Sequence, residues 1–590
     1  MVKLVRKAPV VKNLRDRCLT LIFYLLSFLF VVSLLKNISY PLLWADESMT
    51  VMHGKRVLEY GYPKVHDGKN VLYDLRHSNP KLGIDEKTDA YIGGANWGMY
   101  YVAAVAVTLA EMSNDFYTKT AILRIPFALA GLIGLAILAF LGAQFFENKL
   151  FKYGFLTLFA FFELISIPLV LHLREARYYS LTVFLAALII FIYSRYRILK
   201  QGRDWAYAVV LTISLFLMFV TFSPGYFIFV VAVSLYESIG FLEFLFSKYF
   251  RKTSQIDQNM SFSPNKPFKS YLQHMLPVIL SLIAVSPLIS FFKTFYIAEE
   301  TAKFNRLLFG FSEWEMYLTN LSMIWRYFAL SDFVYLAIFL KFCLLLSFIG
   351  LSIKDVAASD IRKLRFSNFL SVIFIVYFLA IARIPNFPFT RYIVPLQPAL
   401  AAMFILDVFL VYNLISMRRS PKIKYYKVIL LIVFAGFIFT NVSKRMEYIK
   451  GHVYELTHPY RGPLDYLVPF IKETYVDTDK LVIAANYEET SFMYYLNSKV
   501  IIGYVGNNLE EDMRMVPDIV VFRKEWGNLH RKLFLDFLGR RRYQRVSFPV
   551  FDYKVNNIPE LNFPRSGLEH QFRTRYARDE RMKTDIYLKR

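Results

Sequence analysis

The stretch LTLIFYLLSFLFVVSLL, residues 19–35, decides the fold class of this chain. A helix of roughly 20 mostly apolar residues crosses the hydrocarbon core of a bilayer, and this run comes close to that length. The sequence KNISYPLLWADES that follows offers no small-residue site at which a signal peptide would be cleaved. Basic side chains precede the run at Lys3, Arg6, Lys7, Lys12, Arg15 and Arg17. We therefore predict a retained first membrane span with a cytoplasmic N-terminus.

The composition of the whole chain also indicates a membrane protein. Its 590 residues are 56% hydrophobic and 20% charged, with a mean hydropathy of +0.36. Average chains are about 45–50% apolar and about 25% charged, so the departure is in the direction of membrane proteins and away from disordered or collagen-like chains. Cys18 and Cys343 lie far apart in apolar runs, and we expect no disulfide framework.

Further apolar segments bring the predicted number of transmembrane helices to about eleven. They fall near residues 120–145, 153–171, 179–194, 205–222, 226–247, 271–292, 332–352, 367–382, 392–413 and 427–441. The shorter run 97–110 follows GGANWG and predicts a re-entrant or interfacial helix instead of a further crossing.

The basic residues test this topology. With the N-terminus inside, every short basic loop falls on the cytoplasmic side, as the positive-inside rule requires. These loops lie at 149–152, 195–203, 248–269, 362–365 and 418–424. We therefore interpret most of the net charge of +24, from 70 Lys and Arg against 46 Asp and Glu, as an orientation signal. It is not a nucleic-acid footprint, and no nucleic-acid partner is expected.

Residues 442–590 change in character. Short apolar runs at 481–486, 499–506 and 518–523 alternate with helix-like stretches, which is typical of an α/β domain. The predicted fold is thus an α-helical polytopic membrane domain over 1–441, whose outer loop 37–119 carries surface or re-entrant helices. An extracytoplasmic α/β domain over 442–590 follows it.

Two acidic residues, Asp46 and Glu47, begin a predicted surface helix directly after the first span. One interpretation is structural: Asp46 is the N-cap and Glu47 is an acid of the first turn, which the helix dipole favours. The other is catalytic: one carboxylate at the mouth of the span acts as a general base. Adjacent residues of a helix do not face each other, so at most one of the two can be that base.

The second outer loop carries the sequence HLREARYYS, residues 172–180. Arg174 and Arg177 are three residues apart and would form a fork for phosphate oxygens if the helix continued, with Glu175 and Tyr178 beside them. The alternative is that these arginines only anchor a helix end at the membrane surface.

Other charged residues are candidates of the same kind. Arg383 and Arg391 flank a proline-rich turn on the outer face, where phosphate binding and helix-end anchoring again compete, and Lys64 and Lys81 add cations in the first outer loop. Two acidic residues, Glu163 and Asp407, lie inside predicted spans. Each marks either a functional pathway through the membrane domain or an ion pair in the interior of the helix bundle.

The spacing of His53, His66 and His77 is too irregular to define a metal site. No cofactor is therefore assigned, and a divalent metal stays an open alternative.

With these features, the sequence resembles the GT-C superfamily of polytopic glycosyltransferases, in particular the branch of the protein O-mannosyltransferases and aminoarabinose transferases. The resemblance rests on the acidic pair after the first span, the arginine-bearing second outer loop and the late stretch RYIVPLQPAL. It covers roughly residues 1–440. Asp46 matches the catalytic acid of the family, and Glu47 its neighbour. The REARYY stretch lacks the Asp of the mannosyltransferase SRY…D pattern, and Glu175 lies earlier in the loop.

The resemblance implies transfer of a sugar from a polyprenyl-phosphate donor to a glycan, lipid or protein acceptor by an inverting displacement. The reaction would occur on the non-cytoplasmic face of a bacterial inner (plasma) membrane. Two alternatives remain open from the sequence alone. One is a lipid or polysaccharide transporter or flippase, and the other is a glycan ligase that uses a lipid-diphosphate donor.

Overall fold

The computed structural model of the chain describes residues 9–590 with several gaps. The gaps lie at 73–82, 95–96, 251–266, 332–333, 349–356, 385–387, 418–441, 502–513, 525–530, 553–556 and 562–568. The predicted span at 427–441 and the candidate residues Lys81 and His77 lie outside the described residues.

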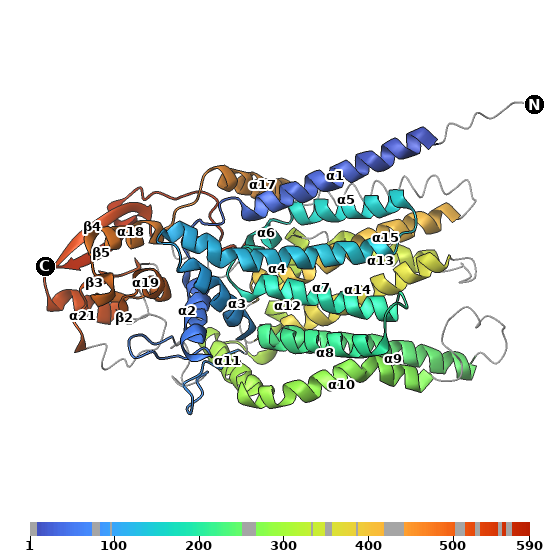
Figure 1. The fold of residues 1–590 in the computed structure, drawn as a ribbon, viewed down its shortest axis with the longest axis horizontal. Coiled ribbons are helices and arrows are strands. Elements are labelled where there is room, and N and C mark those ends of the chain that lie inside the picture. Colours follow the sequence, from blue (N-terminus) through green and yellow to red (C-terminus); the bar gives the residue numbers. More distant parts are fainter. Residues whose placement is uncertain are drawn as a thin grey trace, which may run out of the picture.

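The N-terminal three quarters of the chain form a bundle of long helices (Figure 1). Within the described residues, eight segments are long and apolar enough to cross a membrane. They comprise α1 (Pro9–Leu35), α4 (Phe116–Gln144), α7 (Tyr178–Arg197), α8 (Asp204–Thr221), α9 (Ser223–Phe250), α10 (Pro267–Phe291), α14 (Ala358–Ile381) and α15 (Gln397–Met417), the last with the short turns η3 (Thr390–Tyr392) and η4 (Val394–Leu396) before it.

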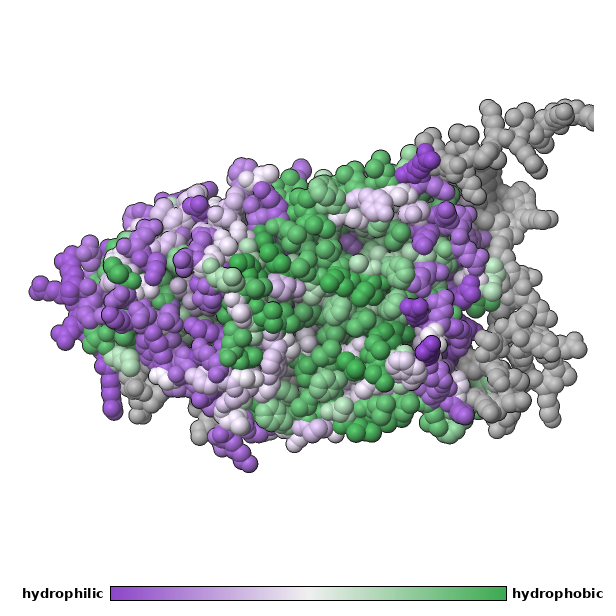
Figure 2. All heavy atoms as spheres, viewed as in Figure 1, coloured by the Kyte–Doolittle hydropathy of each residue, from purple (hydrophilic) through white to green (hydrophobic). Residues whose placement is uncertain are grey.

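Two further pairs of helices raise the number of spans to ten if each bent pair crosses once. They are α5 (Lys149–Ile165) with α6 (Ile167–Leu173), bent by 76°, and α12 (Glu313–Ser331) with α13 (Val334–Phe348). Large apolar side chains such as Phe28 and Ile283 are more than half exposed on the bundle. Figure 2 shows a broad apolar belt across the bundle. This surface confirms the predicted polytopic membrane fold, since a soluble protein rarely exposes such a patch.

Several helices at the end of the bundle near the C-terminal sheet are not candidate spans. They are α2 (Ala45–Tyr60), α3 (Trp97–Ala110), α11 (Thr294–Phe309) and α17 (Val442–Thr457). The run 97–110 forms the apolar helix α3, which at 14 residues is shorter than any of the candidate spans. Gly54 lets α2 approach α3 closely, because a Cβ there would lie 2.9 Å from the Cβ of Ala103.

The C-terminal region, residues 464–590, contains a five-stranded sheet in the order β2-β1-β3-β5-β4. The predicted apolar runs become the parallel strands β1 (Val482–Ala485), β2 (Lys499–Ile501) and β3 (Ile519–Val521). The antiparallel strands β4 (Tyr543–Phe551) and β5 (Lys583–Lys589) complete the sheet. Its helices are α18 (Leu464–Thr474), α19 (Glu489–Leu496) and α21 (Arg531–Arg540), with short turns η5 (Thr478–Lys480) and η7 (Glu580–Met582).

Helix α19 packs the C-terminal region onto the start of α2. The Ser491 hydroxyl donates to the Leu43 carbonyl over 2.7 Å, and the Leu43 N–H donates to the Tyr495 hydroxyl over 3.1 Å. Ser48 and Thr490 join their hydroxyls over 2.6 Å. These contacts fix the first turn of α2, which carries Asp46, between the bundle and the sheet (Figure 1).

Candidate functional site

Asp46 lies in the first turn of α2, where two arginines from distant parts of the chain meet its carboxylate. Arg391 Nη1 lies 3.1 Å and Arg177 Nη2 lies 3.5 Å from Asp46 Oδ2. The Asp46 side chain is 27% exposed, whereas each arginine side chain is 12% exposed. The N-cap of α2 is Trp44, so the interpretation of Asp46 as the N-cap is wrong. The carboxylate instead projects into a cationic corner that solvent can reach.

Arg177 is held in place by the same helix. Its Nη1 donates to the backbone carbonyl of Asp46 over 3.1 Å and to the Thr50 hydroxyl over 3.0 Å. Thr50 lies one turn after Asp46, on the same face of α2. Burial alone would lower the pKa of Arg177, but the negative charge of Asp46 raises it above its usual value. The guanidinium therefore stays charged at any pH at which the protein is folded.

Arg391 reaches Asp46 from the turn before α15. Its guanidinium carbon lies 4.1 Å from the centre of the Phe389 ring, and its Nε lies 3.4 Å from Glu560 Oε1. Glu560 comes from the C-terminal region and accepts the Thr390 N–H through Oε2 over 2.8 Å. Burial raises the pKa of Glu560, and the neighbouring Arg391 opposes that shift. The C-terminal region thus contributes directly to the orientation of a site arginine.

Glu47, unlike its neighbour Asp46, is fully buried. Its two oxygens accept from Arg124 Nε over 2.8 Å and from Arg124 Nη2 over 2.6 Å. The Ala176 N–H also donates to Glu47 Oε1 over 2.9 Å. This bidentate pair ties α2 to α4 and to the loop that carries Arg177. Glu47 therefore fits a structural role.

Glu175 and Tyr178 lie in the same loop, behind the arginines. Glu175 Oε1 lies 2.8 Å from His172 Nδ1, and burial followed by the nearby negative charge of Glu47 raises the pKa of Glu175 well above its usual range. The Tyr178 ring is stacked on Phe222 at 5.1 Å and lies 5.6 Å from the guanidinium carbon of Arg177. Tyr178 is thus an aromatic wall of the site, and Glu175 a buried acid that favours the neutral form.

Arg174 does not join Arg177 in the expected fork. Helix α6 ends at Leu173 and α7 begins at Tyr178, so the three-residue spacing does not bring the two side chains to one helical face. Arg174 Nη2 instead lies 3.0 Å from Glu455 Oε1 in α17. Asn557 Nδ2 donates to Glu455 Oε1 over 3.0 Å, and His570 Nε2 lies 3.2 Å from Glu455 Oε2. Burial would raise the pKa of Glu455, but Arg174 and His570 hold it well below its usual range.

Arg174→Gln is therefore expected to lower stability and to leave the transfer rate per folded molecule unchanged. It would leave Glu455 buried without its guanidinium partner, at a cost of about 3 kcal/mol because Asn557 and His570 remain. Thermal unfolding of the detergent-solubilised protein measures this cost. An unchanged melting temperature combined with weaker donor binding would restore Arg174 to the phosphate site.

Two other predicted cations that the structure describes, Arg383 and Lys64, contact partners other than Asp46. Arg383 is 63% exposed, lies 3.3 Å from Glu313 and stacks over Tyr317. Lys64 lies over the Tyr60 ring at 4.6 Å. Asp407 forms an interior pair with Lys341 at 3.1 Å, which is one of the two roles open for an acid inside a span. Of the predicted arginines, the structure brings only Arg177 and Arg391 to Asp46 within the described residues.

Three residues of the site are not in the sequence prediction. Thr50 could have been found from the helical periodicity of α2, because it lies four residues after Asp46. Arg124 and Glu560 carry no such signal, since each meets its partner only through the tertiary fold. A cavity beside the site, with an empty volume of about 270 Å³, is lined by Trp44, Glu47, Arg174 and Glu175 among others.

Two of the three histidines of the first outer loop, His53 and His66, lie within the described residues. The His53 ring packs against the rings of Tyr91 and Tyr100, with centroid distances of 4.7 and 4.6 Å. His66 Nδ1 accepts the N–H of Gly68. Over the described ranges, no three or more His, Cys, Asp and Glu side chains are grouped so that they could hold a metal ion.

Comparisons with solved structures give several neighbours, two of which are the following. No protein-family model and no curated protein matches the sequence. ArnT from Cupriavidus metallidurans, bound to undecaprenyl phosphate, is 12% identical over 96% of this chain and 97% of that chain, with a TM-score of 0.45. The Archaeoglobus fulgidus oligosaccharyltransferase, tethered with an acceptor peptide, is 10% identical over 90% of this chain and 72% of that chain, with a TM-score of 0.46.

Proposed function

We propose that this chain is a membrane glycosyltransferase that moves a sugar from a polyprenyl-phosphate donor to an acceptor. The observation that carries the proposal is the convergence of Arg177 and Arg391 on the partly exposed carboxylate of Asp46. These three side chains come from the segment after the first span, the loop before α7 and the turn before α15. Such a corner combines one base with two cations, which is what the reaction requires.

The arginines would bind the leaving group. As the bond between the sugar C1 and the phosphate oxygen breaks, negative charge grows on the phosphate, and guanidinium groups stabilise that charge. Arg177 Nε is buried and has no hydrogen-bond partner within the described structure. A buried donor of this kind is costly unless it is satisfied, so a ligand oxygen is a suitable partner.

Asp46 would act as the general base. The acceptor hydroxyl or amine attacks C1 from the side opposite the phosphate, and its proton passes to an Asp46 oxygen as the C1–O bond to phosphate breaks. The products are the glycosylated acceptor, with inverted configuration at C1, and polyprenyl phosphate. Both arginines contact Asp46 before the donor binds, and a phosphate that draws them away would leave the carboxylate able to accept the proton.

The position of the site suits a lipid donor. Helix α2 lies where the polar end of the molecule meets the apolar belt (Figures 1 and 2). A donor could therefore keep its polyprenyl chain in the belt while its phosphate reaches the arginines. Tyr178 and Tyr179 provide aromatic walls, and the Tyr179 hydroxyl is buried without a hydrogen-bond partner in the described part of the chain.

The direct test is an assay of the purified protein in detergent with a polyprenyl-phosphate sugar and candidate acceptors. We expect release of free polyprenyl phosphate that depends on the acceptor. Release of polyprenyl diphosphate from a diphosphate donor would instead identify a glycan ligase. Movement of lipid across reconstituted vesicles without any covalent transfer would identify a transporter or flippase and contradict the proposal.

Arg391→Gln is expected to lower kcat/KM for the donor by a factor of about 10² to 10³, the usual effect of removing one charge-stabilising donor. Arg383→Gln is the matched control, because Arg383 carries the same charge in the same outer turn but faces Glu313. We expect its kcat/KM to equal that of the wild type. Equal losses in the two variants would show that the arginines act only through the overall surface charge.

A further inference from the structure

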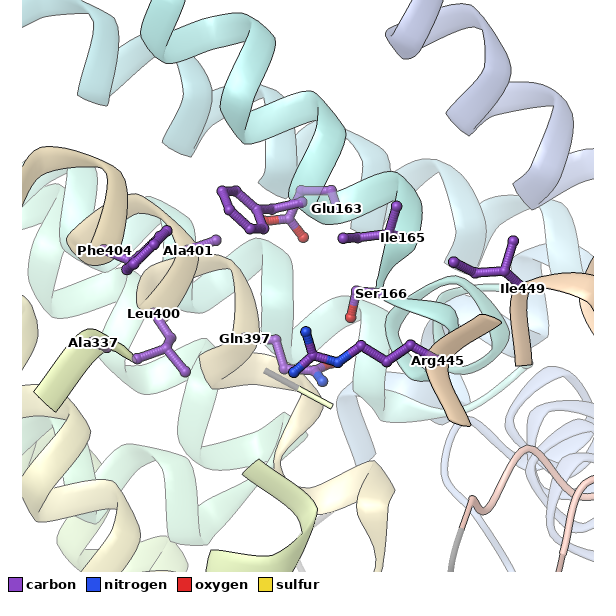
Figure 3. Close-up of a pocket in the computed structure, with 11 residues that line it drawn as sticks. Glu163, Ile165, Ser166, Ala337, Gln397, Leu400, Ala401, Phe404, Arg445 and Ile449 are labelled. Atoms are coloured by element: carbon purple, nitrogen blue, oxygen red, sulfur yellow. The ribbon is translucent and has the colours of Figure 1, made fainter. Parts of the chain in front are cut away.

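Figure 3 shows a cavity at the break between α5 and α6, with an empty volume of about 550 Å³. Its two ionisable side chains are Glu163 and Arg445, and both have interaction partners within the folded chain. These charges therefore need no ligand. Cations that form no ion pair within the described residues lie elsewhere, on the flank of the C-terminal region beside the end of α1 and the start of α4 (Figure 1).

Tyrosine rings from distant parts of the chain gather on this flank. Tyr40, which follows α1, stacks on Tyr117 of α4 with the ring centres 4.4 Å apart. Tyr466 of α18 and Tyr576, which precedes β5, are joined by a hydrogen bond between their side chains. Tyr576 is 63% exposed, and the other three tyrosines are partly exposed. The flank therefore presents aromatic faces with hydroxyl groups at their edges.

Two arginines join these rings into one surface. The Arg461 side chain hydrogen-bonds to Tyr40, and the Arg461 N–H donates to the Thr574 hydroxyl over 2.9 Å. Thr574 directly follows Arg573, whose guanidinium carbon lies 4.1 Å from the centre of the Tyr454 ring in α17. We call these side chains the tyrosine–arginine surface, which comprises Tyr40, Tyr454, Tyr466, Tyr576, Arg461 and Arg573.

Carboxylates within the described residues do not balance the positive charge of this surface. Arg461 and Arg573 are exposed, and neither forms an ion pair with a carboxylate in the described part of the chain. The stretch QFRTRYAR, residues 571–578, contains three arginines and no acidic residue. The positive-inside rule does not explain these cations, because the basic loops at 149–152 and 362–365 lie at the opposite end of the bundle (Figure 1). Exposed arginines among aromatic rings therefore indicate an anionic partner.

This combination of rings and cations fits an acidic glycan. The C–H face of a sugar ring is apolar and packs on an aromatic ring, and the tyrosine hydroxyl can bond to sugar hydroxyls. A guanidinium binds a carboxylate or a phosphate through two parallel hydrogen bonds. Tyr40 also lines the cavity beside the site at Asp46. A glycan bound to this surface would thus lie next to the donor site.

We propose that the tyrosine–arginine surface binds an acidic glycan, a chain of sugars that carries carboxylate or phosphate groups. A sugar ring lies on Tyr576, and the acid groups lie against Arg461 and Arg573. On the basis of the proposed function, this glycan is the acceptor, and the surface selects acidic glycans over neutral ones. An acidic peptide would supply the charges without the sugar rings, and a neutral glycan would supply the rings without the charges.

Isothermal titration calorimetry of the full-length protein in detergent tests the binding without any assay of transfer, so its failure would leave the proposed function standing. Tetragalacturonate, a short glycan with a carboxylate on every sugar, should bind about tenfold more tightly than its methyl ester. It should also bind about tenfold more tightly than tetraglutamate, which has a similar charge without sugar rings. Pentamannose 6-phosphate should be the tighter of the two acidic glycans if the natural acid group is a phosphate.

Variants decide which residues are responsible. Arg573→Gln should weaken the binding of the acidic glycan about tenfold, and Tyr576→Ala about fivefold. The melting temperature should stay the same, because both side chains are exposed. Arg383→Gln is the matched control, because Arg383 is also exposed and lies over a tyrosine ring, that of Tyr317, but faces Glu313. Its affinity for the glycan should equal that of the wild type.

The same variants test the role of the glycan as acceptor. In the transfer assay with an acidic acceptor, Arg573→Gln should raise the KM for the acceptor and leave kcat unchanged. An unchanged KM would overturn the acceptor role. Equal binding of tetragalacturonate and its methyl ester, equal binding of tetraglutamate, no binding of either acidic glycan, or equal losses in Arg573→Gln and Arg383→Gln would overturn the proposal as a whole.

Discussion

Asp46→Asn is expected to reduce sugar transfer by a factor of about 10² to 10⁴, the usual contribution of a general base. Asparagine has nearly the same shape as aspartate, and its amide oxygen can still accept hydrogen bonds from Arg177 and Arg391. The amide cannot take up the acceptor's proton at neutral pH. The loss should therefore appear in kcat, while the KM for the donor stays the same or falls, because a negative charge beside the phosphate has been removed.

Steady-state kinetics with purified variants measure this split. Asp115→Asn is the matched control: Asp115 also stands at the start of a helix, where its carboxylate accepts the Thr118 N–H over 2.7 Å. Asparagine is an equally good N-cap, so this variant should transfer sugar at the wild-type rate. If a folded Asp46→Asn protein transferred sugar at the wild-type rate, Asp46 would not be the general base, even if Arg177 and Arg391 bind the phosphate.

The sequence predicted the elements that depend on local patterns. Apolar runs and the position of basic loops located the spans that the structure describes, and alternating short runs located the parallel strands of the sheet. Arg177 and Arg391 were candidates because the positive-inside rule gives no reason for cations on the predicted outer face, and the structure brings both side chains to Asp46. Arg174 was misplaced because the helix stops before it, which residue spacing alone does not reveal.

The contacts between remote segments were not predictable. Glu560 lies in the irregular stretch NNIPELNF, which has no helical or strand periodicity, yet it contacts Arg391 some 170 residues away in the chain. Arg124 lies within an apolar span and resembles a membrane anchor in the sequence. Only the folded structure shows that its guanidinium faces Glu47 and the carbonyls of Ile38 and Pro41.

Glu47→Ala is expected to destabilise the protein by about 3 to 5 kcal/mol, because it leaves the buried Arg124 guanidinium without its carboxylate. Such a cost is a large part of the stability of an ordinary domain. A double variant, Glu47→Leu with Arg124→Met, should recover part of the loss, since replacing both members of a buried ion pair by apolar side chains is often tolerated. Recovery will be incomplete, because the Ile38 and Pro41 carbonyls lose the donor that Arg124 provides.

Thermal unfolding and transfer activity, measured on the same preparations, separate the roles of the two adjacent acids. Asp46 is partly exposed and shared by two arginines, so its loss should affect turnover and leave the melting temperature near that of the wild type. Glu47 is fully buried and paired with Arg124, so its loss should lower the melting temperature first. If Glu47→Ala kept its melting temperature and lost turnover, the two roles would have to be exchanged. The base would then be the Glu47 carboxylate, which is fully buried in the folded chain and out of reach of an acceptor. For this reason we expect the opposite result, a lower melting temperature for Glu47→Ala.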